Sequence, residues 1–361
     1  MRYAGLARRD LRRYGGHRVD AVAELATRPG LCPASLIHAG GEILCCEAWE
    51  AAVMLLPPGQ AGPLGAHFEH RPRERLAWAR SMLGVDALAP YTLEPALFPR
   101  AGRVIYNAVG GVDLDRRDPL MRAEVFGKLR AAAHVSARDA ETLRILRANG
   151  IPASLLPDPA VMAAALFGPQ IRQRARHGEV AQTMGAFPRG YLAIQFSEDF
   201  GDDATLDQIA AQLHRAAQAT GCGVVLFRAG AAPWHDGLSC YARLAQRLRT
   251  PALRIFRSLD IWDICAVIAH SRGFAGSSLH GRIVAMAFAL PRLNFTRPGQ
   301  APETGKQAAF AATWEAPGTL GAVALPELAD GIGCALAMAR EQMARTAREL
   351  VAAYRDGFVA G

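Results

Sequence analysis

Lysine is almost absent from this sequence of 361 residues, because Lys128 and Lys306 are the only two among 41 basic residues. The other basic side chains are arginines, and with frequent alanine, glycine and proline they are typical of a GC-rich coding bias. The net charge of +8 favours anionic ligands and membrane surfaces in a general way. Aromatic residues make up only 7% and are not interleaved with the basic ones, so we expect no nucleic-acid partner.

Long apolar runs and paired cysteines are also missing. No run reaches the roughly 18–20 apolar residues of a membrane span, and the N-terminus lacks the apolar stretch of a signal peptide. We therefore expect a cytoplasmic protein, with peripheral association at the inner membrane left open. The seven cysteines are scattered and form no CxxC pair, which indicates neither a zinc site nor a disulfide framework. We expect small buried thiols, no metal and no cofactor.

Short β-branched runs alternate with alanine-rich helical patterns along most of the chain. This alternation predicts an α/β fold with parallel sheets that are covered by helices on both faces. The predicted strands are 34–38, 103–108, 132–136, 191–196, 223–227, 253–256, 273–276 and 292–295. The predicted helices are 139–149, 204–220, 238–248, 261–270 and 279–289. The pattern indicates two Rossmann-like, doubly wound domains.

The length suits two domains of about 150 residues each. The stretch from Phe167 to Arg189 has little apolar periodicity and carries Gly-Pro and several arginines, so it is interpreted as a connection. Apolar residues at helical spacing near the end predict a long terminal helix that packs across both domains. The predicted segments are 1–170, a linker at 171–189, 190–324, and the terminal helix at 325–361.

The strongest candidate site is the segment Gly276-Ser277-Ser278-Leu279-His280-Gly281-Arg282. Ligands of open parallel sheets bind beyond the carboxyl ends of the strands, and this segment joins a predicted strand to a helix. Gly276 permits a tight turn, and Ser277 or Ser278 suits the N-cap, where free N–H groups favour anions. His280 then serves as an acid or base near neutral pH, with Arg282 close by. A capping serine with a structural histidine is the plain alternative.

Four further residues follow predicted strands. Arg138 is placed to bind a carboxylate or phosphate with its guanidinium fork, although a surface pairing with a nearby carboxylate explains it equally well. Lys306 retains a point charge in a chain that has almost entirely replaced lysine by arginine, although chance explains its presence equally well. His235, in a Trp-His-Asp loop, is a candidate for the acceptor side, and Gly41 permits close backbone approach to a ligand. An ordinary loop or turn accounts for the last two as readily.

Taken in order, several segments resemble the polysaccharide pyruvyl transferase family. The match rests on Ser278-Leu279-His280-Gly281 with the apolar helix behind it, on Ser136-Ala137-Arg138-Asp139, on Leu156-Pro157-Asp158-Pro159-Ala160, and on Gly40-Gly41-Glu42. It spans about residues 34–315. The family usually opens with a strand and an Asn/Gly-Asp element, which the arginine-rich start of this chain does not show.

The resemblance implies a GT-B-like pair of Rossmann domains with phosphoenolpyruvate as donor substrate. The acceptor it implies is a pair of sugar hydroxyls on a free or lipid-linked glycan of the cell envelope. It assigns catalytic roles to His280 and Arg138. Lys306 matches a further donor-holding position. Ser278, Arg282, Gly41 and His235 complete the predicted substrate-binding set.

Two other functions fit the same pattern. A GT-B glycosyltransferase that uses a nucleotide sugar needs the same two domains and a basic diphosphate site. A non-catalytic relative that binds a glycan or a lipid carrier is the second alternative. Binding of a nucleotide sugar, of phosphoenolpyruvate, or of an acceptor without turnover distinguishes the three.

Overall fold

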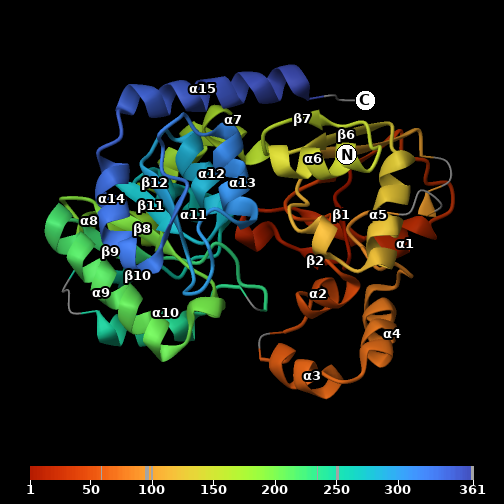
Figure 1. Ribbon diagram of the computed structural model, residues 1–361, viewed down its shortest axis with the longest axis horizontal. Helices are drawn as coiled ribbons and strands as arrows, with labels where there is room; N and C mark the ends of the chain where they lie inside the picture. The colour runs from red at the N-terminus through yellow and green to blue at the C-terminus, as the bar shows by residue number, and fades with distance from the viewer. Residues whose placement is uncertain (58, 94–96, 99–100, 234, 249–251, 359–361) are drawn as a thin grey trace. The chain divides into compact units, whose positions relative to one another are not determined.

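The chain forms two compact units in the computed structural model, which describes residues 1–57, 59–93, 97–98, 101–233, 235–248 and 252–358 (Figure 1). The first unit comprises Met1–Asp158 together with Asp356–Gly361, and the second comprises Pro159–Arg355. Within the described residues, no helix combines the length and the apolar character that crossing a membrane requires.

The first unit is built around a parallel sheet with strand order β4-β5-β6-β7. Its strands are β4 (Ser35–Ala39), β5 (Arg103–Val109), β6 (His134–Ala137) and β7 (Ser154–Leu155). Its helices are α1 (Val22–Ala26), α2 (Ala48–Val53), α3 (Ala61–Phe68), α4 (Pro72–Leu83), α5 (Pro119–Arg130) and α6 (Ala140–Ala148). Apolar side chains of α5 and α6 pack on β5 and β6 in the main core of the unit.

The N-terminus forms a small separate sheet instead of extending the parallel one. It consists of β1 (Ala4–Gly5), β2 (Arg9–Asp10) and β3 (Arg18–Ala21) in the order β1-β3-β2. The order of the parallel sheet is consecutive, so its described strands contain no reversal of winding.

The second unit has a six-stranded parallel sheet with the order β10-β9-β8-β11-β12-β13. Its strands are β8 (Tyr191–Gln195), β9 (Gly223–Leu226), β10 (Leu253–Ile255), β11 (Gly273–Gly276), β12 (Arg292–Thr296) and β13 (Ala322–Ala324). Its helices are α7 (Ala163–Arg174), α8 (Gly178–Ala186), α9 (Asp203–Thr220), α10 (Leu238–Arg247), α11 (Ile261–Ala269), α12 (Leu279–Ala287), α13 (Gly305–Trp314), α14 (Leu328–Leu336) and α15 (Arg340–Gly357).

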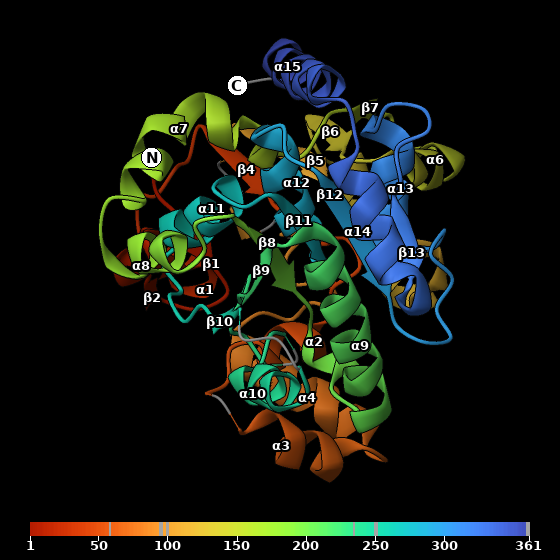
Figure 2. The same cartoon turned by 90° about the vertical axis from the view of Figure 1, so that its left-hand side faces the viewer.

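Different helices cover the two faces of this sheet (Figure 2). Side chains of α9, α10 and α14 pack on one face, and those of α7, α8, α11 and α12 pack on the other. The strands β8, β9 and β11 are buried on both faces, which explains why their sequences are nearly continuous apolar runs. The winding reverses between β8 and β11, as expected for a doubly wound fold. The predicted α/β class with two Rossmann-like units is thus confirmed.

The predicted segments differ from the observed ones in two places. The boundary lies between Asp158 and Pro159, and the stretch interpreted as a linker contains α7 and α8. Each of these helices places few fully buried apolar side chains in the core, among them Ile171 and Val180, too few to produce a visible period. The terminal segment is divided, because α14 packs on the sheet while α15 packs on α12 and α13.

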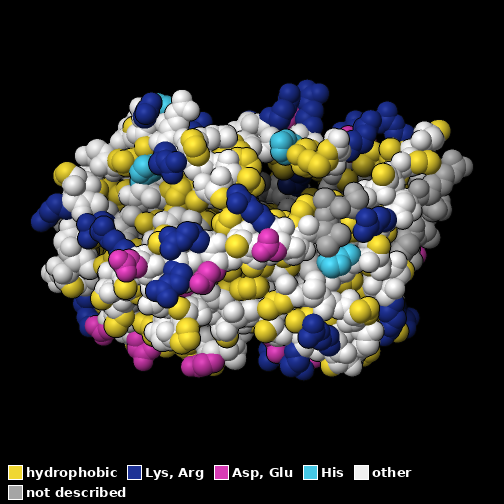
Figure 3. Space-filling view, turned by 90° about the horizontal axis from the view of Figure 1, so that it is seen from above, with side chains coloured by type: hydrophobic (Ala, Val, Ile, Leu, Met, Phe, Trp, Pro, Cys, Tyr) yellow, Lys and Arg dark blue, Asp and Glu magenta, His cyan; other side chains and the backbone are white. Residues whose placement is uncertain are grey.

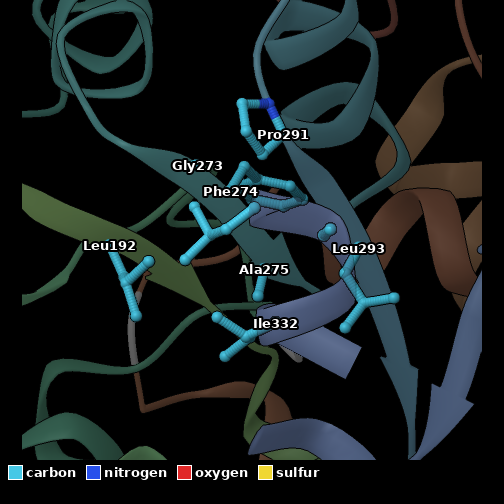
Figure 4. Close-up of a pocket in the computed structure, with 9 residues that line it drawn as sticks. Leu192, Gly273, Phe274, Ala275, Pro291, Leu293 and Ile332 are labelled. Atoms are coloured by element: carbon cyan, nitrogen blue, oxygen red, sulfur yellow. The ribbon is translucent and has the colours of Figure 1, made fainter. Parts of the chain in front are cut away.

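A small cavity lies between the sheet and α14, at the end of β11 opposite the candidate site (Figure 4). Its volume is about 10 Å³, and its lining includes Leu192, Phe274, Leu293 and Ile332. This volume corresponds to roughly one water molecule, and the walls are apolar. The cavity is therefore a packing defect and not a ligand site.

Candidate functional site

The point where the winding of the second unit reverses lies at the carboxyl ends of β8 and β11. Gln195 ends β8, Gly276 ends β11, and the two residues are partners in the parallel ladder. Connections from these strands leave toward opposite faces of the sheet, which is where doubly wound folds bind their ligands. The predicted segment Gly276–Arg282 therefore starts at the expected place in the fold.

Gly276 is required here by close packing and not by a special backbone angle. A Cβ atom on Gly276 would lie 2.4 Å from the main-chain oxygen of Gln195 and 2.8 Å from the ring of Phe274. The glycine is not among those with positive φ, so the tight turn that the sequence suggested is not the reason for it. Any side chain at this position would push β8 and β11 apart.

Ser278 caps helix α12, as predicted. Its Oγ accepts a hydrogen bond from the Gly281 amide at 3.1 Å, and its backbone is extended, as an N-cap requires. The start of a helix carries a partial positive charge, which favours an anion at this end. His280 lies in the first turn, and its side chain is exposed.

Buried hydrogen bonds of the Gln195 and Asp236 side chains form a bridge that holds this turn in place. The Gln195 side chain accepts a hydrogen bond from the Ser278 amide at 2.7 Å and donates one to Asp236 Oδ1 at 2.7 Å. The Ala229 amide donates to Asp236 Oδ2 at 2.6 Å. Gln195 is 2% exposed and Asp236 is 7% exposed. Burial raises the pKa of Asp236 to about 6, although these hydrogen bonds oppose the shift.

Further hydrogen bonds join the loops that follow neighbouring strands. The Ser197 amide donates to Ser277 Oγ at 3.2 Å, and the Glu198 amide donates to the His235 carbonyl at 2.8 Å. The Gln307 side chain donates to the Ser277 carbonyl at 2.6 Å. The loops after β8, β9, β11 and β12 therefore form one connected rim.

Polar and cationic groups stand on this rim with exposed side chains. They are His235, His280, Arg297 and Lys306. Arg297 follows β12 and donates to the Asp199 carbonyl at 3.4 Å, and Lys306 directly precedes Gln307 at the start of α13. Lys and Arg side chains also lie scattered over the face shown in Figure 3, without gathering in one patch. The rim of the second unit can thus offer cations to an anionic ligand.

Arg282 does not fit its predicted contact with substrate. Its side chain is fully buried, and all its N–H groups have acceptors inside the unit. They donate to Glu315, to the Asn294 side chain, and to the main-chain oxygens of Leu320 and Gly321. A guanidinium group whose N–H donors are all engaged in this way cannot bind an anion unless it gives up some of these internal hydrogen bonds. Arg282 is therefore structural, a correction to the sequence analysis.

Glu315 joins Arg282 to a second buried arginine, Arg292, whose Nε lies 2.7 Å from Glu315 Oε1. Burial alone would raise the pKa of Glu315, but the two arginines lower it below its usual value. Asn294 accepts from Arg282 at 3.3 Å and donates to the Gly276 carbonyl at 2.6 Å. The ionic cluster is thereby linked to the turn after β11.

In the first unit, Arg138 lies at the corresponding end of β6 but is 1% exposed. It donates to Glu42 and, at 3.4 Å, to Asp158. Its Nε lies 3.9 Å from Asp139 Oδ2. The surface pairing considered for Arg138 is therefore wrong, because the pairing is buried. An anion could contact this guanidinium only if a carboxylate gave way.

Gly41 and Gly110 bring two loops together around this arginine. The Gly110 amide donates to the Gly41 carbonyl at 2.9 Å. A Cβ atom on Gly110 would lie 2.5 Å from Glu42 Oε2 and 2.7 Å from the Arg138 guanidinium. Gly41 thus lies beside the charged cluster of Glu42 and Arg138. The sequence predicted close approach of the Gly41 backbone to a ligand, but in the structure this backbone contacts the Gly110 amide of the protein itself.

The sequence analysis did not single out Gln195, Asn294 or Gln307. Gln195 had a detectable signal, since its amide side chain stands at the end of β8, which is otherwise apolar. Asn294 lies in β12 beside Arg292 and Thr296, so its polarity did not stand out. Asp236 was noted only as part of a loop. Among the described residues, no group of three or more His, Cys, Asp or Glu side chains is arranged to hold a metal ion.

Comparison with solved structures finds remote likenesses. A UDP-GlcNAc 2-epimerase from Methanocaldococcus jannaschii aligns at 11% identity and TM-score 0.46, covering 71% of this chain and 69% of the other. A trehalose-phosphate synthase from Burkholderia xenovorans aligns at 11% identity and TM-score 0.46, covering 78% and 73%. A UDP-GlcNAc 2-epimerase from Neisseria meningitidis aligns at 12% identity and TM-score 0.44, covering 90% and 100%. Such distant likenesses say nothing of substrate.

No curated protein matches the chain. A family model for polysaccharide pyruvyl transferase matches residues 96–297, which is more than half of the sequence. The matched residues include Arg138 and the complete turn from Gly276 to Arg282, whereas Lys306 lies beyond them. The chain belongs to the polysaccharide pyruvyl transferase family.

Proposed function

We propose that the protein transfers a pyruvyl group from phosphoenolpyruvate to two hydroxyls of a sugar in a cell-surface polysaccharide or its precursor, forming a ketal. The family match carries this proposal. The geometry of the second unit supports it, because the turn of the matched segment lies where doubly wound folds bind ligands. The donor is a substrate, and the proposal requires no cofactor.

The chemistry consists of one addition and one displacement at the same carbon atom. The first sugar hydroxyl adds to the carbon that carries the phosphate and gives up its proton to a base, while an acid delivers a proton to the neighbouring methylene carbon, so the net number of protons is unchanged. The second hydroxyl then displaces phosphate from the carbon that carries it and its proton leaves with the phosphate. The products are a pyruvyl ketal and inorganic phosphate, and no oxidant or reductant is needed.

The donor carries a carboxylate and a phosphate, so its site needs fixed positive charge. Lys306, Arg297 and the amide groups at the start of α12 supply it on the rim of the second unit. His280, on the first turn of the same helix, is proposed to transfer the proton or to contact the phosphate. His235 is proposed for the acceptor side. Arg138 stays a predicted donor residue whose use requires displacement of Glu42 or Asp158.

The direct test is phosphate release from phosphoenolpyruvate with a panel of glycans, together with the mass gain of a pyruvyl ketal. We expect release only when a suitable acceptor is present. Binding and turnover of a nucleotide sugar, without any turnover of phosphoenolpyruvate, would instead support a glycosyltransferase. Acceptor binding without turnover of either donor would support a non-catalytic protein.

The role of His280 is tested by His280→Ala, which we expect to lower kcat by roughly 10²–10⁴-fold, the usual contribution of a general acid or base. His177→Ala is the matched control, because His177 is also exposed on the second unit. A His280→Ala protein as fast as the parent would remove His280 from the mechanism. His280→Gln keeps a hydrogen-bond donor for phosphate but cannot transfer a proton, so a kcat close to that of the parent in this variant would favour phosphate contact over proton transfer.

A further inference from the structure

Beneath the rim of the second unit, the side chains of Gln195 and Asp236 form a hydrogen-bonded bridge that the family assignment does not explain. Gln195 and Asp236 are both buried, and neither is one of the residues predicted to touch the donor. Polar side chains at such positions normally serve a defined set of hydrogen bonds, because an unsatisfied buried group costs about 1–3 kcal/mol. Here the bonds lead to the Ser278 amide on one side and the Ala229 amide on the other.

We propose that Gln195 and Asp236 are positioning residues of the transfer reaction, which hold the Ser278–His280 turn and the His235 loop in one fixed geometry. This inference rests on the proposed function of the same site. The Gln195 amide group connects the two segments, since its oxygen accepts from the turn and its nitrogen donates to the loop.

The polarity of the bridge is fully determined by its ends. Both ends are main-chain N–H groups, which only donate. The three hydrogen bonds between these two donors therefore need three acceptors and one donor from the two side chains. A carboxylate paired with an amide provides this balance, whereas two amides or two ionised carboxylates do not. The pair Gln195–Asp236 therefore has one equivalent arrangement, in which the amide and the carboxylate exchange places.

Several charged and titratable groups surround Asp236. His235 precedes it, and Arg228 stands beside the Ala229 amide on the loop after β9. Cys240 and Tyr241 on α10 face it, and Glu198 on the loop after β8 contacts the same loop through Gly237. None of these groups replaces Gln195 as the donor to Asp236 Oδ1.

The test uses Gln195→Glu, Asp236→Asn and the double variant that carries both changes. Gln195→Glu places two carboxylates in contact, and Asp236→Asn forces two N–H donors to face each other. Because either change displaces the loops that carry the catalytic groups, we expect kcat to fall at least about tenfold in each single variant. In the double variant, the new carboxylate on β8 accepts from the Ser278 amide and from the new amide group on the loop. The oxygen of that amide group accepts from the Ala229 amide. All the bonds are restored, and we expect kcat to return to within about threefold of the parent, with the KM for phosphoenolpyruvate little changed.

The control is Gln182→Glu with Asp207→Asn, which makes the same chemical changes at exposed positions of the second unit. A double variant at positions 195 and 236 that is as impaired as the two singles combined would overturn the proposal. So would single variants with the kcat of the parent.

Hydrogen exchange at the Ser278 amide separates this proposal from the function on which it rests. We expect faster exchange in each single variant and slow exchange again in the double variant, whether or not phosphoenolpyruvate is the donor. If the parent releases no phosphate, the proposed function fails while the bridge is still tested. Equal exchange rates in all four proteins would overturn the bridge itself.

Discussion

The carboxyl edges of the two parallel sheets are built from different interactions. In the first unit the arginine at this edge is buried against Glu42 and Asp158. In the second unit the loops are joined by hydrogen bonds of amide and hydroxyl groups and of the buried carboxylate of Asp236, and the buried charges of Arg282, Arg292 and Glu315 are engaged with one another and with the main chain. His280 and Lys306 are left exposed above them.

A charged residue that stabilises a loop and one that binds a ligand look alike in a sequence, and this difference between the two edges separates them. Arg138 and Arg282 both follow strands in motifs of the family, but both are held by carboxylates in the fold. A charge whose partners are already satisfied stabilises a loop more readily than it binds a ligand. The exposed groups of the second rim are therefore the better candidates for contact with donor.

The largest expected effect tests the buried charges of the second unit. Glu315→Gln leaves Arg282 and Arg292 facing each other without a counter-charge. Removing one partner of a buried ionic cluster typically costs ~3–5 kcal/mol, and we expect the free energy of unfolding, measured in urea, to fall by that amount. Glu303→Gln, an exposed glutamate of the same unit, should change it little. A Glu315→Gln protein as stable as the parent would show that the arginines do not need this partner.

A smaller effect compares the glycines at the two edges. Gly276→Ala and Gly110→Ala each force a methyl group into occupied space, and such overpacking costs ~1–3 kcal/mol. Gly276 meets the backbone of β8, whereas Gly110 meets side-chain ends of Glu42 and Arg138. We therefore expect Gly276→Ala to be the more destabilising of the two in urea unfolding.

Matched controls exist in both units. Gly185 in α8 and Gly127 in α5 have open space where a Cβ atom would lie. Replacing either by alanine should stabilise the protein slightly, by ~0.4–1 kcal/mol, because the unfolded chain loses conformational freedom. If Gly110→Ala lowered the free energy of unfolding more than Gly276→Ala, the edge of the first unit, with its buried charges, would be the more rigid of the two.

Much of this fold could be predicted from the sequence, because central parallel strands are largely apolar and β4, β5 and β11 end at or directly before a glycine. The turn from Gly276 to Ser278 was located for that reason, with Ser277 and Ser278 as the two candidates for the cap. Burial of Arg138 and Arg282 could not be foreseen, since their partners Glu42 and Glu315 are remote in sequence. The same holds for Gln195, whose role depends on an amide and a carboxylate in two other loops. α7 and α8 were missed because each has few fully buried apolar anchors.

The smallest expected effect concerns pH and has opposite signs for two buried groups, one in each unit. His38 of the first unit is buried and stacked on Tyr106, and burial lowers its pKa to about 4. Because the unfolded chain then binds the proton more tightly, His38 makes the fold less stable as pH falls below about 6.5. Burial raises the pKa of Asp236 to about 6, so this carboxyl makes the fold more stable as pH falls over the range from about 6 toward 4.

Between pH 7 and pH 5.5 each group should change the free energy of unfolding by about 1 kcal/mol, in opposite directions. Single variants separate the two contributions when each is compared with the parent. On acidification over this range His38→Gln should lose less stability than the parent, because the destabilising protonation of His38 is gone. Asp236→Asn should lose more stability than the parent over the same range. Urea unfolding at the two pH values measures both differences, and the same sign in both variants would contradict the assignment.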